Sequence, residues 1–184
     1  MKIMMRAVAA CALGGLMCAD AHAFRSMGKL GDAAMFIANG WAIAMAASEP
    51  NFDGIIQYGL STGGALLTTD LISNYVIHER RPNKNDTRSF PSGHATGSFS
   101  PAMYIHRRYG LKQAIVPYSL AIFTGFTRVY TKNHYVHDVL GGAVVSGLFT
   151  WMAVSRLDKT GTSCLELTPT LGADGGGMRF RVTF

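Results

Sequence analysis

A histidine and an aspartate, His134 and Asp138, stand at positions i and i+4 near the expected start of an apolar helix. That spacing places both side chains on one helix face, within reach of each other. A carboxylate bonded to one ring nitrogen fixes the imidazole tautomer and leaves the other nitrogen free to attack phosphorus. Alone, such a pair is more often a capping or surface pair, so its neighbours decide its meaning. We expect the adjacent His137 and Lys132 to be surface residues.

The turn Pro91-Ser92-Gly93-His94 stands where a loop is expected to become a helix. Backbone N–H groups at the positive end of a helix attract anions. Ser92 can donate its hydroxyl, and Gly93 lets a ligand approach the backbone without meeting a Cβ. His94 can protonate a leaving alkoxide, because histidine titrates near neutrality. The turn therefore predicts an anion-binding site that also supplies an acid.

Two arginines complete the set. Pro82 ends a helix and leaves Arg81 at its terminus, and Arg128 lies at the end of another apolar helix, shortly before His134. Guanidinium groups bind phosphate through paired donors. Phosphoryl transfer needs donors on the equatorial oxygens, an in-line nucleophile and an acid for the leaving group. The combination predicts a metal-independent phosphohydrolase.

The order Arg-Pro, Pro-Ser-Gly-His and Arg-x5-His-x3-Asp resembles the type 2 phosphatidic acid phosphatase superfamily, which includes bacterial acid phosphatases and vanadium-dependent haloperoxidases. The resemblance covers residues from about 70 to 145. It implies a helical bundle and a phosphatase activity that requires no metal and no other cofactor. It also implies three catalytic residues, the nucleophile His134, its partner Asp138 and the general acid His94. The implied phosphate-binding residues are Arg81, Ser92, Gly93, Arg128 and Asn74.

Two positions depart from the family pattern. Asn74 stands where the family has a lysine, and Thr127 replaces the serine that usually precedes the last arginine. Threonine is a mild change. A neutral amide cannot neutralise phosphate charge, so the loss of that lysine could cost a few kcal/mol of transition-state stabilisation. Lys84 and Lys132 are candidates to compensate.

Short breaks separate the helices that we expect, and the pattern predicts an all-α bundle of about five to six helices. The expected helices are Gly31 to Ser48, Phe52 to Glu79, Ser92 to Tyr109, Leu111 to Thr127 and His134 to Leu157. After Leu157, apolar and polar residues alternate on both sides of the turn-like segment 173–177, which predicts a short C-terminal β-hairpin. An outer-membrane β-signal is the less favoured interpretation, because two strands cannot close a barrel.

The chain begins with the pattern of a secretory signal peptide, residues 1–23. Lys2 and Arg6 precede the apolar run Ala7 to Ala19, and Ala21-His22-Ala23 has the form of a cleavage site. The run is shorter than the ~20 residues that span a bilayer, although an uncleaved anchor is the alternative. We expect export to the periplasm, with association or embedding in the membrane as a further possibility.

After cleavage, we expect the mature chain to consist of a helical phosphatase domain at 24–160 and a hairpin tail at 161–184. It also leaves Cys164 as the single cysteine. One thiol forms neither an intramolecular disulfide nor a zinc cluster, so no metal site is expected.

Composition narrows the partners. The chain has 184 residues, 48% hydrophobic and 15% charged, which suits one domain with a large core. Its net charge of +6 suits anionic substrates or an anionic lipid surface. The sequence holds no polybasic tract interleaved with aromatic residues, so nucleic acid is not an expected partner.

Membrane insertion is the open question at this level. The uncharged stretches are short for a span, and Asn39, Asp70, Asn74 and His78 interrupt the apolar pattern. These interruptions favour a soluble or peripheral bundle, with an integral membrane form as the alternative.

Hydrolysis of phosphate monoesters or pyrophosphates through a phosphohistidine is the leading hypothesis, with a lipid phosphate as the favoured substrate. The first alternative is a soluble periplasmic acid phosphatase that acts on small phosphoesters. Vanadate-dependent halide oxidation and non-catalytic binding of phosphate or lipid head groups are weaker alternatives.

Overall fold

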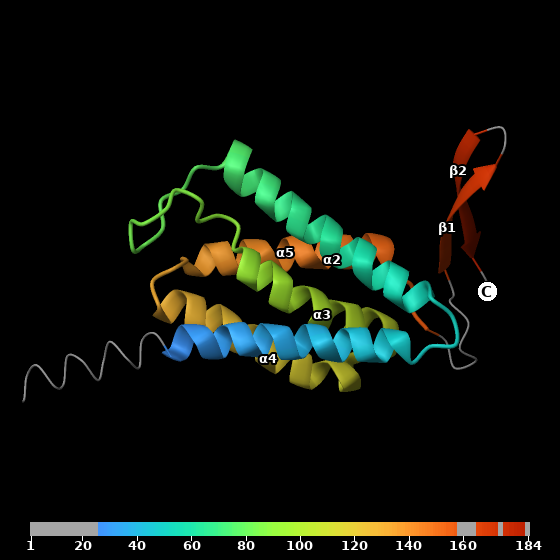
Figure 1. The fold of residues 1–184 in the computed structure, drawn as a ribbon, viewed down its shortest axis with the longest axis horizontal. Helices are drawn as coiled ribbons and strands as arrows, with labels where there is room; N and C mark the ends of the chain where they lie inside the picture. Colours follow the sequence, from blue (N-terminus) through green and yellow to red (C-terminus); the bar gives the residue numbers. More distant parts are fainter. Residues whose placement is uncertain (1–25, 158–164, 173–174, 183–184) are drawn as a thin grey trace, which may run out of the picture.

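The computed structural model describes residues 26–157, 165–172 and 175–182, and the expected signal peptide lies outside them. The described part forms five α-helices (Figure 1). They are the first helix Ser26–Ala47, α2 Asp53–Leu71, α3 Gly93–Tyr109, α4 Leu111–Tyr130 and α5 Val136–Ala153. The prediction of an all-α bundle is confirmed for residues 26–157.

Several helix ends differ from the expected ones, and two of these differences bear on the predicted site. Helix α2 was expected to continue to Glu79, but it passes into a π-helical turn, η1, at Ile72–Val76 and the chain is extended from Ile77. Helix α5 was expected to begin at His134 and begins at Val136 instead. Both differences place polar residues in loops at the same end of the bundle.

Small side chains build the helix interfaces. Helix α5 buries Gly142, Ser146 and Thr150 on one face, and small residues of this kind let helix backbones approach closely. A Cβ on Gly142 would stand 2.7 Å from the Ser92 carbonyl oxygen and 2.9 Å from the Thr96 nitrogen, so this contact requires glycine. The first helix buries alanine on every fourth residue, at Ala34, Ala38, Ala42 and Ala46.

Helix α3 lies in the middle of the bundle and contacts α2, α4 and α5. The first helix joins it through Asn39, whose Nδ2 donates to the Gly97 carbonyl oxygen at 2.9 Å. At the far end of α3, Arg108 is fully buried and forms an ion pair with Glu49, from the loop that follows the first helix. The loops 77–92 and 131–135 meet at the end of the bundle that holds the predicted site. The Arg108–Glu49 pair joins the loop after the first helix to α3 at the opposite end.

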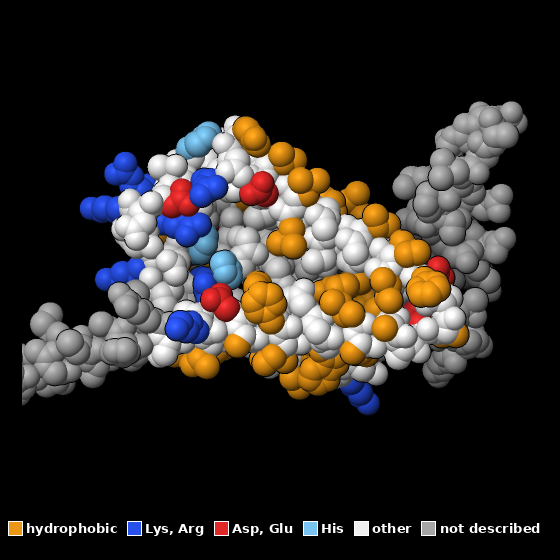
Figure 2. All heavy atoms as spheres, in the orientation of Figure 1, with side chains coloured by type: hydrophobic (Ala, Val, Ile, Leu, Met, Phe, Trp, Pro, Cys, Tyr) orange, Lys and Arg blue, Asp and Glu red, His pale blue; other side chains and the backbone are white. Residues whose placement is uncertain are grey.

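Charge and apolar surface are separated along the molecule (Figure 2). Basic, acidic and histidine side chains gather at the loop end, and apolar side chains cover much of the helices on the visible face. Large apolar residues on several helices are exposed, with Phe36 at 69% and Trp151 at 70%. Two helices, Ser26–Ala47 and Val136–Ala153, are long and apolar enough to cross a membrane by length and composition.

Beyond the helices, strands β1 Leu165–Gly172 and β2 Gly175–Val182 pair antiparallel, with Leu165 opposite Val182. The assignment of the fold class rests on the helices alone. That the C-terminal hairpin packs against the rest of the protein stays a prediction.

Candidate active site

His134 lies in the loop between α4 and α5, outside the helix in which it was expected. The backbone nitrogens of Asn133 and His134 both donate to the Arg128 carbonyl oxygen, at 3.0 and 3.2 Å, and this turns the chain after α4. Asp138 lies in the first turn of α5, where its Oδ2 accepts from the Tyr135 nitrogen at 2.8 Å. The two predicted partners still meet, because His134 Nδ1 stands 3.4 Å from Asp138 Oδ2.

Ser89 is a third member of this group. Its carbonyl oxygen accepts from His134 Nδ1 at 2.9 Å, and its hydroxyl donates to Asp138 Oδ2. A carbonyl oxygen only accepts, so Nδ1 carries the proton and Nε2 carries the lone pair of the neutral ring. This arrangement leaves the lone pair on Nε2, the nitrogen that the predicted nucleophile would use.

Burial sets the protonation of His134. Desolvation, followed by the nearby Arg81 guanidinium, lowers the pKa of His134, while Asp138 and the Ser89 carbonyl act in the opposite direction. The imidazole therefore stays neutral to a lower pH than a free histidine does. A nucleophile must be neutral at the attacking nitrogen, so this shift favours the proposed role.

The N-terminus of α3 faces the same space. Ser92 is its N-cap, with Oγ accepting from the Ala95 nitrogen, and its own backbone nitrogen donates to the Asp138 carbonyl oxygen at 3.0 Å. The Ser92 side chain itself is fully buried. A Cβ on Gly93 would have no neighbour within 4 Å, so open space lies in front of this residue. The helix end is thus accessible to an anion.

Asp32 of the first helix bridges two predicted site residues. Its Oδ1 stands 3.2 Å from His94 Nε2 and 2.9 Å from Arg128 Nη2. Arg128 is nearly buried and also donates to the Gly28 carbonyl oxygen at 2.6 Å. Sequence reasoning missed Asp32, although a carboxylate inside an apolar helix is a signal for a functional residue. Desolvation, then Arg128, lowers the pKa of His94, and Asp32 counteracts this.

Arg81 reaches the cavity from the loop 77–92, whereas Asn74 lies in η1 and does not line the cavity. Arg81 Nε donates to the Arg88 carbonyl oxygen at 3.3 Å, and its Nη2 is 3.7 Å from Asp86 Oδ2. Asn74 Nδ2 donates to both the carbonyl oxygen and the carboxylate of Asp70, each at 2.8 Å. The amide therefore turns its donor toward α2 and its oxygen toward the loop.

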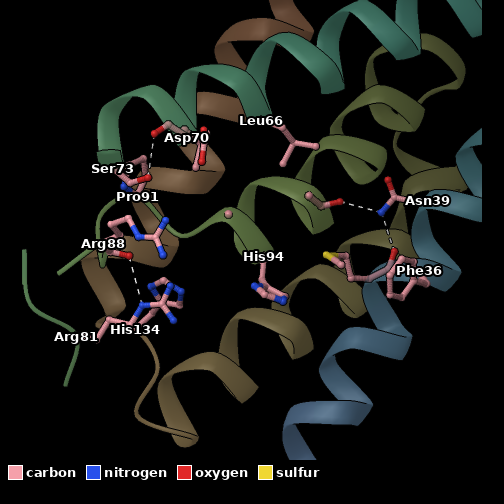
Figure 3. A pocket seen from close by; sticks show the side chains of 14 residues that line it. Phe36, Asn39, Leu66, Asp70, Ser73, Arg81, Arg88, Pro91, His94 and His134 are labelled. Carbon is pink, nitrogen blue, oxygen red and sulfur yellow. Dashed lines mark hydrogen bonds between the residues drawn. The ribbon is translucent and has the colours of Figure 1, made fainter. Parts of the chain in front are cut away.

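A cavity of about 690 Å³ joins these groups (Figure 3). Figure 3 shows Arg81, Arg88 and His134 at one end of the cavity and the apolar side chains of Phe36 and Leu66 toward the other end, and Met35 also lines it. Arg81, Gly93, His94 and His134 line the cavity, whereas Asn74, Ser92, Arg128 and Asp138 are not among its lining residues. Arg88, which the sequence did not single out, lines it as well.

One group among the described residues has ligand atoms close enough to hold a metal ion: Glu79, His137 and Asp138, within 4.8 Å of one another. His137 Nε2 stands 2.9 and 3.0 Å from the two carboxylate oxygens of Glu79. An ion pair of the exposed His137 with Glu79 accounts for this proximity. His137 and Lys132 are exposed, as expected, and do not line the cavity.

The helical bundle, the buried His-Asp pair, the accessible N-terminus of α3 and the two arginines in the cavity agree with the family that the sequence motifs resemble. Residues 56–161 match the family model of the PAP2 superfamily. The chain belongs to this superfamily, as the motifs predicted.

Curated relatives carry names of lipid phosphatases. The chain is 38% identical over 132 residues to a lipid A 4'-phosphatase of Helicobacter pylori, a match that covers 71% of this chain and 64% of that protein. It is 35% identical over 74 residues to a lipid A 1-phosphatase of Porphyromonas gingivalis, which covers 39% of this chain and 17% of that protein. The matches thus span less than two thirds of each relative.

The fold also matches solved structures. The crystal structure of Aquifex aeolicus LpxE superposes with a TM-score of 0.56 at 16% identity, covering 72% of this chain and 92% of that one. At this level of identity the similarity concerns the fold.

Proposed function

We propose that the protein is a membrane-embedded phosphatase that removes phosphate from a phosphorylated lipid. The cavity is the observation that supports this proposal most directly. Its cationic, histidine-bearing end suits a phosphate group, and its apolar wall of Met35, Phe36 and Leu66 suits an acyl chain. A head group at the polar end of the cavity would place its apolar chains along the bundle.

In the proposed reaction, His134 Nε2 attacks phosphorus while the bond to the leaving oxygen breaks. Ser89 and Asp138 hold the ring in the required tautomer, and the Asp138 carboxylate stabilises the positive charge of the phosphohistidine. Arg81, Arg128, and Ser92 with the N–H groups of the α3 N-terminus stabilise charge on the phosphoryl oxygens.

His94 would donate a proton to the leaving oxygen, and the same group would then activate the water that opens the phosphohistidine. It lines the cavity across from His134 (Figure 3). Asp32 holds its ring and Arg128 in one network. Inorganic phosphate and the dephosphorylated lipid are the products.

The distribution of side chains supports membrane embedding. Buried positions on the first helix and α5 are small, and large apolar residues face outward, as with Leu148 at 57% exposure. This pattern suits helices that pack in lipid through small residues. It favours the integral form over the soluble bundle that the polar interruptions suggested. The names of the relatives make lipid A the first substrate to test.

The chain organisation belongs to the same proposal. We retain a signal peptide at 1–23 with export to the periplasm, a phosphatase domain at 24–160 and a hairpin tail at 161–184. The concentration of the site between Asp32 and Asp138 supports these domain limits. The sequence pattern of the first residues supports export.

Trapping of the phosphoenzyme tests the mechanism. Rapid quenching of the purified protein with radiolabelled lipid phosphate is expected to leave acid-labile, alkali-stable label on wild type and none on His134→Ala. The exposed neighbour gives the control, so His137→Ala should still be labelled. Equal labelling of His134→Ala would contradict the assignment.

A further inference from the structure

Arg88 stands at the cationic end of the cavity, and neither the motifs nor the comparisons assign it a role. We propose that Arg88 binds the substrate phosphate and takes over the charge of the lysine that Asn74 replaces. This inference rests on the proposed function, because it names a further binding residue of the same site. Three features of the structure carry it.

The first feature is position. Arg88 lines the cavity together with Arg81, His94 and His134, and Figure 3 shows its side chain between His134 and the end of α2 at Asp70. Lys84 and Lys132, the candidates from sequence, are exposed and do not line the cavity. Arg88 is therefore the cation that the fold brings to the place of the missing charge.

The second feature is the orientation of Asn74. Its Nδ2 is committed to Asp70, which leaves Oδ1 as an acceptor, and Arg88 Nη1 donates to this oxygen at 3.3 Å. A lysine at this position has no acceptor to offer and would repel the guanidinium. The amide thus suits an arginine held next to it. Asn74 acts here as a positioning residue.

The third feature is the free donor capacity of the guanidinium. Arg88 Nε and Nη2 each bond to the Asp86 carboxylate at 3.2 Å, and Nη1 bonds to Asn74. A guanidinium has five N–H donors, so these three contacts leave the second hydrogens of Nη1 and Nη2 for a ligand. The Asp86 carboxylate also faces Arg81, so it holds the two guanidinium groups side by side when no ligand is bound. A phosphate would bind through the N–H donors that these two groups still have free.

The test is a charge-relocation cycle in the full chain. Arg88→Ala is expected to lower kcat/KM for a lipid phosphate, and to weaken binding of orthovanadate, by about 10- to 100-fold, which is the usual worth of a charge-assisted hydrogen bond. Adding Asn74→Lys to Arg88→Ala should restore most of the loss. Arg80→Ala, an exposed arginine outside the cavity lining, is the matched control and should change neither value.

The outcomes separate the two proposals. Active wild type with Arg88→Ala within twofold of it would overturn the role of Arg88 and leave the phosphatase proposal intact. Loss in Arg88→Ala without recovery in the double variant would overturn the charge replacement. If wild type releases no phosphate, the phosphatase proposal fails, and vanadate binding still decides on Arg88: unchanged or undetectable binding across the series would overturn it.

Discussion

At the scale of single residues, the site is a network in which each reactive group is held by another. Ser89 fixes His134 through its carbonyl oxygen, and Asp32 joins His94 to Arg128. The sequence assigned no role to either Ser89 or Asp32. Their roles depend on contacts between loops and helices distant in the chain, which spacing alone does not reveal.

The pH dependence follows from the two histidines. His134 must be neutral to attack and His94 must be protonated to donate, so kcat/KM should rise through the pKa of His134 and fall through that of His94. Burial lowers both pKa values, which places both limbs at lower pH than free histidine would. The pH optimum of the free enzyme should therefore lie below the one that two free histidines would give.

Asp32→Asn tests this assignment. Asp32 raises the pKa of His94 by charge and hydrogen bonding, so its neutralisation lowers that pKa and His94 loses its proton at lower pH. The alkaline limb of the kcat/KM profile should move to lower pH, and the limb set by His134 should stay in place. Asp53→Asn, at the opposite end of the bundle, is the control. An unmoved alkaline limb would contradict the role of Asp32.

At the scale of elements, the contact between α3 and α5 sets the geometry of the site. The Ser92 backbone nitrogen bonds to Asp138 across this contact, so the anion-binding helix end and the His-Asp pair are positioned together. The contact depends on the absence of a side chain at Gly142. A substitution of Gly142 should therefore displace both the N-terminus of α3 and the His134–Asp138 pair.

Gly142→Ala should displace the N-terminus of α3, because the added Cβ meets the Ser92 carbonyl oxygen and the backbone of Thr96. Overpacking of this kind costs about 1–3 kcal/mol, and we expect a lower Tm and a loss of phosphatase activity. Gly147→Ala in the same helix is the matched control, since its Cβ would stand 3.5 Å from Met103 Sδ in ordinary contact. Equal Tm and activity of the two variants would contradict the account.

The sequence predicted the helices better than their ends. Apolar runs and breakers located all five helices, because helix formation follows local pattern. The π-helical turn after Leu71 and the loop that holds His134 depend on tertiary contacts, so the expected helices ran too far at Glu79 and began too early at His134. The motif residues were identified by chemistry and spacing, whereas the position of Arg88 required the folded loop.

At the scale of the whole molecule, the first helix and α5 bury small residues and expose large apolar ones. Ala38 and Ala42 are fully buried while Phe36 and Ile37 on the same helix are exposed. The sequence showed the apolar content but not its direction, and the polar interruptions at Asn39 and Asp70 pointed to a soluble bundle. In the structure Asn39 donates to the Gly97 backbone of α3 and accepts from the Tyr58 hydroxyl of α2, and Asp70 lines the cavity, so both are compatible with a bundle in lipid.

The measurement that tests the central claim most directly is phosphate release from a lipid A phosphate in detergent micelles, compared with a water-soluble aryl phosphate, both with chelator present. We predict release that resists the chelator, a kcat/KM at least about tenfold higher for the lipid, and no release by His134→Ala. Faster hydrolysis of the aryl phosphate would contradict the lipid assignment, and full activity of His134→Ala would contradict the mechanism.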